Sequence, residues 1–142
     1  MTEHRTALLL AGLVVGALTT GAVLAQTPPI STDLRLETST TVIGQPIVYP
    51  SGTPEVTVAI VTIEPGASTG WHRHEVPVIG YVLEGELTVD YGPDGTRLYR
   101  PGDALAEALG TEHDGTNTGD VPTRLLAVYL GAEGVANSTP TP

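Results

Sequence analysis

Apolar and polar residues alternate along much of the chain with the two-residue period of β-strands, and helical periodicity is poor beyond the first 25 residues. Over 56–63, the residues Val56, Val58 and Ile60 lie on one face of a predicted strand. Further strands are predicted over 79–90, 96–99, 104–109 and 125–130. Gly and Pro separate these segments at intervals of about eight to twelve residues, which indicates a β-sandwich or β-barrel.

Turn signals divide the predicted strands further. Glu84 and Gly85 interrupt the apolar run over 79–90 and suggest a hairpin. The cluster at 91–95, which reads Tyr-Gly-Pro-Asp-Gly, predicts a second turn. The run over 125–130 is continuously apolar and suits a strand that is buried on both faces. These segments together predict an all-β domain.

The first 25 residues have the order of a secretory signal peptide: a short polar start, an apolar stretch over 7–18, and small residues before Gln26. Cleavage after Ala25 is the prediction, which places the mature protein in the periplasm or outside the cell. The alternative is an uncleaved membrane anchor, but the apolar run is shorter than the ~20 residues of a membrane-spanning helix.

The ends of the remaining chain are polar and contain prolines. Residues 26–34 are predicted to be a loose leader and residues 134–142 a flexible tail, which leaves a single domain at 35–133. A chain of this length suffices for one modest core and is too short for two domains.

The composition excludes several kinds of functional site and binding partner. The chain has no cysteine, so disulfides, thiolate metal sites and cysteine nucleophiles are excluded. The net charge of −10 argues against nucleic acid as a partner, and against anionic membranes once the signal peptide is removed. The chain has one Trp and no Phe, so a core of Val, Ile, Leu and Ala is expected.

Three histidines remain after the predicted signal peptide: His72, His74 and His113. In an extended strand, His72 and His74 point to the same side and can chelate one ion. His113 is far along the chain, so only the fold can bring it close. Taken alone, the His-x-His triplet is weak evidence, and a polar strand end near Trp71 would explain it equally well.

These histidines occupy fixed positions in two spaced motifs. The first motif consists of Gly66, His72, His74, position 78 and Gly85. The second consists of Gly102, position 108, Gly110, His113 and Asn117. In this order and spacing the chain resembles the cupin superfamily over roughly residues 35–133. The resemblance implies a cupin double-stranded β-helix, or jelly-roll barrel, a metal held by the three histidines, and a homodimer.

Two motif positions depart from the usual cupin residues. Position 78 is Val where cupins usually have a glutamate ligand, and position 108 is Ala where they usually have Pro. Glu107 is the candidate replacement, as a fourth ligand or a general base, although an outward-facing Glu107 is the open alternative. Because imidazoles dominate and thiolates are absent, Fe, Mn, Ni, Cu and Zn all remain candidates for the metal.

The resemblance implies two main functions. One is a metal-dependent, dioxygenase-like enzyme that acts on a small organic molecule, with Val78, Ile79 and Tyr81 as the pocket wall. The other is a non-catalytic module that binds a metal or a small ligand, since fold alone does not decide function. Sugar isomerase or epimerase chemistry ranks lower, because the stretch over 76–83 offers few acids or bases.

Overall fold

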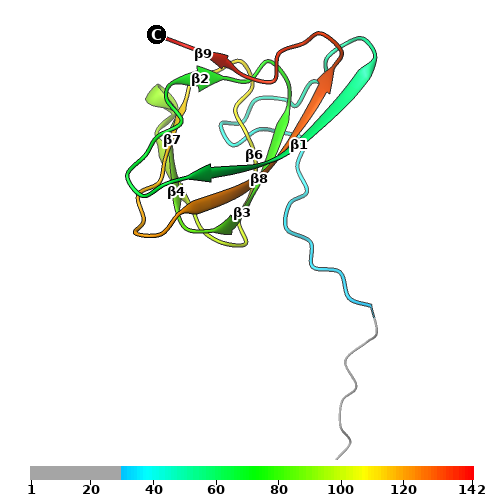
Figure 1. The fold of residues 1–142 in the computed structure, drawn as a ribbon. Coiled ribbons are helices and arrows are strands. Elements are labelled where there is room, and N and C mark those ends of the chain that lie inside the picture. The colour runs from blue at the N-terminus through cyan, green and yellow to red at the C-terminus, as the bar shows by residue number, and fades with distance from the viewer. Residues whose placement is uncertain (1–29) are drawn as a thin grey trace, which may run out of the picture. The chain divides into compact units, whose positions relative to one another are not determined.

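We describe residues 30–142 of a computed structural model of the protein. The predicted signal peptide and the first residues of the leader lie outside this range. The strands are β1 (Pro54–Ile63), β2 (His72–Arg73), β3 (Val78–Glu84), β4 (Leu87–Asp90), β5 (Thr96–Tyr99), β6 (Ala104–Ala106), β7 (Asp114–Thr116), β8 (Thr123–Ala132) and β9 (Thr139–Pro140) (Figure 1). One short 3-10 helix, η1, spans Gly92–Asp94. Within residues 30–142, no helix is long and apolar enough to span a membrane.

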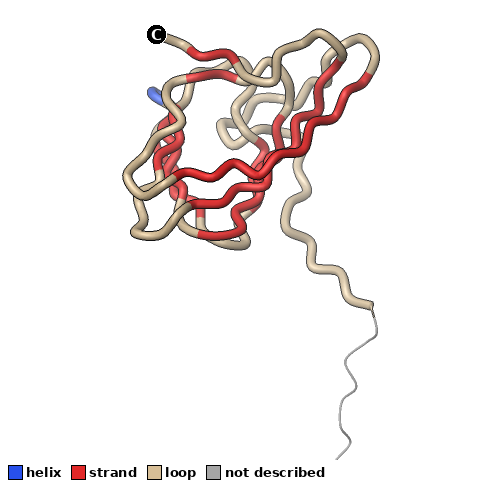
Figure 2. Tube along the Cα trace, in the orientation of Figure 1, coloured by secondary structure: helices blue, strands red, loops and turns tan. Residues whose placement is uncertain are grey.

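The strands form two larger sheets and one small one. The first sheet has the order β1-β8-β3-β6, the second has the order β5-β4-β7, and β2 pairs with β9 alone. All the strand pairs are antiparallel. Buried side chains from both larger sheets, including Ile63, Val82, Leu87, Val89 and Leu105, belong to one hydrophobic cluster. The all-β prediction is therefore confirmed: the regular structure of the described residues in Figure 2 is strand, apart from the short helix η1.

The two predicted turns have different outcomes. The turn over 91–95 joins β4 and β5, which pair directly, as the sequence predicts. Gly85 does lie in a turn, with φ of 73°, but β3 and β4 belong to different sheets, so the turn closes no hairpin. A Cβ added at Gly85 would lie 2.7 Å from both Pro122 O and Thr123 Cα, so the chain can cross between the sheets here only with glycine.

The alternation predicted for β1 is present, and its Val56, Val58 and Ile60 lie on the outer face. All three side chains are exposed, whereas Ile63, on the alternate face, is buried. In register, they lie opposite apolar residues of β8: Leu130, Val128 and Leu126. The β8 side chains over 124–126 and 128–130 are half-buried, so the prediction of a strand buried on both faces holds only in part.

The core contains two large aromatic side chains that composition did not predict. Tyr91 has no exposed surface and Tyr99 is buried, and their hydroxyl groups lie 3.2 Å apart. They join the aliphatic cluster of both sheets. The expected core of Val, Ile, Leu and Ala therefore also contains two buried tyrosines.

The C-terminal segment also differs from the loose tail that its prolines suggest. Thr139 and Pro140 form β9 and pair with Arg73 and His72 of β2. The backbone N–H of Thr141 donates to Trp71 O at 3.0 Å. The strand β2 has free backbone groups at its edge, and the tail satisfies them. Pro140 is compatible with this place because an edge strand tolerates a missing N–H.

Candidate metal centre

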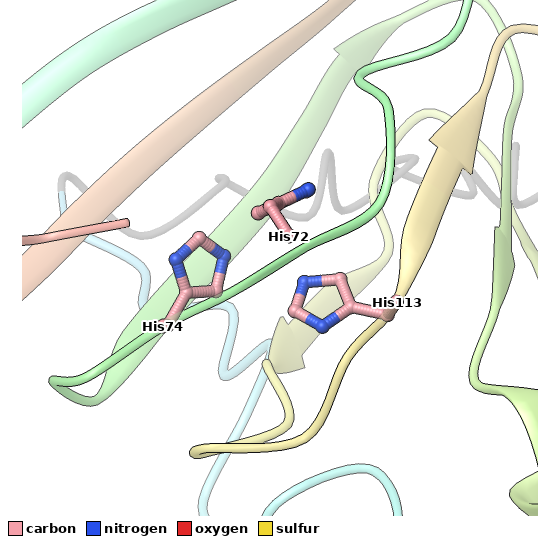
Figure 3. Close-up of side chains that lie close together, drawn as sticks. All are labelled: His72, His74 and His113. Atoms are coloured by element: carbon pink, nitrogen blue, oxygen red, sulfur yellow. The ribbon is translucent and has the colours of Figure 1, made fainter. Parts of the chain in front are cut away.

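The three predicted histidines converge, as Figure 3 shows. One ring nitrogen from each of His72, His74 and His113 lies within 4.8 Å of those of the other two. Backbone pairing brings the motifs together: His72 N–H donates to His113 O at 3.0 Å, and His113 N–H donates to His72 O at 2.9 Å. The His-x-His strand and the distant His113 are thus held side by side by reciprocal main-chain hydrogen bonds.

Each of the three imidazoles has its Nδ1 within hydrogen-bond distance of a backbone carbonyl. In the order His72, His74 and His113, the acceptors are Gly70 O at 2.7 Å, Asn137 O at 3.0 Å and Thr111 O at 2.9 Å. A carbonyl can only accept, so Nδ1 carries the proton when the ring is neutral and the lone pair is on Nε2. This arrangement fixes the tautomer that binds a metal through Nε2.

Burial favours the neutral, metal-binding form of the His74 ring. Desolvation lowers the pKa of His74 to about 4, with smaller contributions from the neighbouring histidines, so His74 is neutral at pH 7. The Nε2 atom of His113 is buried and has no hydrogen-bond partner among the described residues. A buried polar atom without a partner is costly, and a bound cation would satisfy it. The residues present therefore fit a divalent transition metal.

Glu107 lies beside this cluster. Its side chain is buried, its Oε1 accepts a hydrogen bond from the Ala108 N–H at 2.7 Å, and its Oε2 is 4.0 Å from His113 Nε2. Among the described residues, His113 is its only ion-pair partner within 4.0 Å. The inward orientation, one of the two that the sequence left open, is the one observed. A buried carboxylate without a fixed cation is unfavourable unless a positive charge is supplied.

Sequence reasoning missed the tyrosines around the site. Burial first, and then the negative charge of Glu107, raise the pKa of Tyr91, which keeps its hydroxyl protonated. The Tyr129 ring lies 5.7 Å from that of His74, and burial raises the pKa of Tyr129 as well. Tyr91 belongs to a turn cluster that reads as exposed, so the local pattern carried no signal for its burial.

A cavity of about 80 Å³ adjoins the histidines. Its wall is largely apolar, and Val78 belongs to it, as predicted. Ile79 and Tyr81 do not line it, because they alternate with Val78 and Gly80 and lie on the outer face of β3. The predicted pocket wall thus needs correction at two of three positions. Besides Val78 and the histidines, the lining residues are Val61, Ile63, Thr69, Gly80, Leu87, Val89, Leu105, Glu107, Gly115, Leu125, Ala127 and Tyr129.

Comparison with known families matches residues 59–129, half of the chain, to the Cupin domain. The matched range contains all three histidines and Glu107. No curated protein matches the sequence.

Solved structures similar to this one have the same fold. The chain is 22% identical to an uncharacterized Klebsiella pneumoniae protein with a double-stranded β-helix domain, with a TM-score of 0.53 over 66% of this chain and 84% of that one. It is 23% identical to the formate complex of Lactobacillus farciminis oxalate decarboxylase, with a TM-score of 0.52 over 60% of this chain and 26% of that chain. These likenesses confirm the predicted double-stranded β-helix.

A third structure is that of Bacillus subtilis oxalate decarboxylase, which has Mn(II) centres. It is 26% identical, with a TM-score of 0.50, and the match covers 63% of this chain and 24% of that chain. This chain therefore spans about a quarter of the length of the two oxalate decarboxylases that it resembles.

Proposed function

The chain belongs to the cupin family, and from this premise we propose that it binds one divalent transition-metal ion through His72, His74 and His113 and acts as a dioxygenase-like enzyme on a small organic molecule. The observation that carries the proposal is the buried Nε2 atom of His113, which has no partner among the described residues and lies 4.0 Å from a buried carboxylate. A cation at this point would satisfy both groups.

The donor set limits the identity of the metal. Three imidazoles with one nearby carboxylate suit Fe, Mn, Ni, Cu or Zn, and the chain has no thiolate to select a softer ion. The Mn(II) centres named for the Bacillus subtilis enzyme support a divalent metal in this fold. When bound, such a metal supplies Lewis-acid polarisation and, for the redox-active members, electron transfer to oxygen.

Glu107 has two roles in this proposal, and both would use its Oε2. Its Oε1 is engaged by the Ala108 N–H, whereas its Oε2 faces His113. Oε2 is therefore available either to bind the ion or to take a proton from a substrate that lies beside it. Of the cavity wall, only Glu107, Tyr129 and the three histidines carry side chains with a titratable group.

The charge of the cavity favours neutral or singly charged substrates. The described wall contains no Arg, and the chain has no Lys. A divalent ion and the Glu107 carboxylate sum to +1, which a monoanionic chelator such as an enolate or thiolate would neutralise. A dianion such as oxalate would leave an uncompensated negative charge in an apolar cavity. We therefore favour a diketone, a thiol or a catechol as substrate.

The alternative is a non-catalytic metal- or ligand-binding module. The observation that favours it is the small number of titratable groups in the cavity, because Glu107 cannot both bind the ion and remain a general base. Stoichiometric zinc in the natively purified protein, without turnover, would support this alternative.

Oxygen consumption tests the catalytic proposal. The metal-free protein is reconstituted in turn with Fe, Mn, Ni or Cu and offered a panel of diketones, thiols and catechols. We expect one metal to support oxygen uptake that His113→Ala abolishes. Inactivity of every combination, together with tight metal binding, would contradict catalysis and leave the binding module.

We also propose that the protein forms a homodimer through the outer face of the β1-β8-β3-β6 sheet. Val58 and Ile60 are 63% and 47% exposed there, and the paired positions of β8 are apolar too. The chain carries a net charge of −10, yet these positions carry none, so two copies can meet here without facing like charges. Light scattering should give a dimer mass that Val58→Glu lowers to a monomer. The control Leu98→Glu, at an exposed apolar site of the other sheet, should remain a dimer.

Export is a further part of the proposal and rests on residues 1–25 alone. Cleavage after Ala25 predicts that the mature protein begins at Gln26. N-terminal sequencing of protein recovered from the periplasm or the medium tests this, and an intact Met1 terminus would contradict it.

A further inference from the structure

The C-terminal segment 137–142 reaches the candidate metal centre through one main-chain group. Asn137 O lies 3.0 Å from Nδ1 of His74, which donates to it. We propose that this segment is a positioning element, and that the Asn137 carbonyl holds His74 in the orientation and tautomer that bind a metal. The inference rests on the proposed metal site and adds a part of the chain that neither cupin motif includes.

His74 differs from the other two histidines in where its acceptor comes from. His72 and His113 each donate to a carbonyl two residues earlier, at Gly70 and Thr111, so their own turns position them. The acceptor for His74 is 63 positions away in the sequence. The Nδ1 hydrogen bond of His74 therefore depends on how the end of the chain packs, whereas the acceptors for the His72 and His113 rings lie in their own turns.

The loss of this acceptor would change the chemistry of the ring. Without a hydrogen bond to Nδ1, a neutral imidazole exchanges between its two tautomers, and the one protonated at Nε2 cannot bind a metal through that atom. The ring would also lose a restraint on its rotation. Interactions of this kind contribute about ten- to a hundredfold to metal affinity.

Two sets of contacts hold the segment in place. Asn137 Nδ2 donates to Thr57 Oγ1 of β1 at 3.0 Å, and the Asn137 side chain lies over Gly131, where a Cβ would be 3.3 Å from Asn137 Oδ1. Further along, Thr139 and Pro140 pair with β2. The first set anchors Asn137 itself, and the second acts beyond it, so truncation can separate them.

Two C-terminally truncated variants separate the anchor of Asn137 from the pairing of β9 with β2. A chain that ends at Ser138 keeps the Asn137 carbonyl and its anchor to Thr57 but loses β9. A chain that ends at Ala136 loses both. Long-range ¹H–¹⁵N spectra of the metal-free proteins report the tautomer of each histidine, and Zn²⁺ affinity is measured by competition with a chromophoric chelator.

We expect the chain that ends at Ser138 to bind Zn²⁺ within about threefold of the full chain, and the chain that ends at Ala136 to bind about ten- to a hundredfold more weakly. In the latter, His74 becomes a mixture of tautomers, whereas His72 and His113 are unchanged. The full-length variant Thr57→Val, which loosens the anchor without truncation, should give a smaller shift of the same kind at His74 alone.

An unchanged His74 tautomer and affinity in the chain that ends at Ala136 would overturn the inference. An equal change at all three histidines would indicate general loss of structure in the truncated chain, and the full-length Thr57→Val then decides: a change at His74 alone supports the inference, and an unchanged His74 overturns it. Failure of the full chain to bind Zn²⁺ would instead refute the proposed metal site, and the metal-free spectra would still test the positioning of His74.

Discussion

The two arms of the candidate metal centre are built differently. The arm with His72 and His74 begins with the two-residue strand β2 at the edge of the barrel, where Trp71 is exposed and His72 half-buried, and it continues to His74, which is buried. The arm with His113 lies inside, next to buried Glu107 and within 5.7 Å of the ring of Tyr91. The first arm contributes two of the proposed ligands and pairs with the C-terminal segment, and the second contributes one proposed ligand and belongs to the core.

Because the two arms are built differently, effects of substitutions on metal binding can be separated from effects on folding stability. A side chain at an edge strand can be exchanged with little cost to folding, whereas a buried one takes part in the packing of both sheets. Substitutions of the histidines in the two arms should therefore lower metal affinity to a similar extent but lower the free energy of unfolding to different extents.

His113→Ala should have the largest effect. It removes a ligand, for which we expect a loss of Zn²⁺ affinity of at least about a hundredfold, and it leaves a hole beside the core that destabilises the metal-free protein by about 2 kcal/mol. His72→Ala should weaken Zn²⁺ binding as much and change the free energy of unfolding by less than about 0.5 kcal/mol. Chelator competition and urea unfolding measure the two quantities; equal destabilisation by both variants would remove the distinction between the arms.

Acidification should destabilise the metal-free protein through His74. Burial lowers the pKa of His74 to about 4 in the folded state, from 6.5 for the free side chain, so the unfolded chain binds the extra proton first. The stabilising contribution of neutral His74 is complete above pH 6.5 and is lost as the pH falls towards 4, by about 3 kcal/mol in total.

Urea unfolding between pH 7 and 4.5 measures this slope. The variant His74→Gln should flatten it, whereas His72→Gln, on the same arm but more exposed, should leave most of it in place. A slope that is the same in wild type and His74→Gln would show that another group carries the pH dependence.

Glu107→Gln should raise the stability of the metal-free protein and lower its affinity for Zn²⁺. The amide oxygen can still accept from the Ala108 N–H, so the hydrogen bond is kept while the buried charge is removed. We expect the metal-free protein to gain about 1 kcal/mol and Zn²⁺ affinity to fall about tenfold. Thermal melts with and without Zn²⁺ give both values, and a variant that is less stable without metal and binds Zn²⁺ normally would rule out the proposed role of the carboxylate.

Thr69→Val tests the polar connection between the arms and should have the smallest effect. Thr69 Oγ1 accepts from the Gly115 N–H at 3.0 Å and donates to Asp114 Oδ1 at 3.2 Å, both on the inner arm. The loss of these hydrogen bonds should lower the free energy of unfolding by about 0.5–1 kcal/mol and slightly weaken Zn²⁺ binding. Thr118→Val removes a comparable hydrogen bond to Thr88 elsewhere on the second sheet and should leave Zn²⁺ binding unchanged.

The parts of the protein that sequence could predict are those with local signals. Strand alternation and turn residues predicted most of the strands, and the spacing of the two motifs identified the three histidines that converge. Alternation distinguishes the faces of a strand but not which face is inside when both are apolar. The predicted pocket wall of Val78, Ile79 and Tyr81 combines residues of both faces of β3, and Ile79 and Tyr81 lie on the face outside the pocket.

The parts that sequence could not predict depend on contacts between distant segments. Tyr91 lies in a turn-like stretch, and only the packing of the two sheets buries it. Asn137 lies in a proline-containing tail, and its hydrogen bond to His74 has no counterpart in local spacing. Both residues were missed because burial and pairing are properties of the assembled barrel.

Metal content tests the central claim most directly. Elemental analysis of the natively purified chain should give about one divalent transition-metal ion per molecule, and a folded His72→Ala/His74→Ala variant should give less than a tenth of that. An equal metal load in both proteins would contradict the assignment of the ion to these histidines.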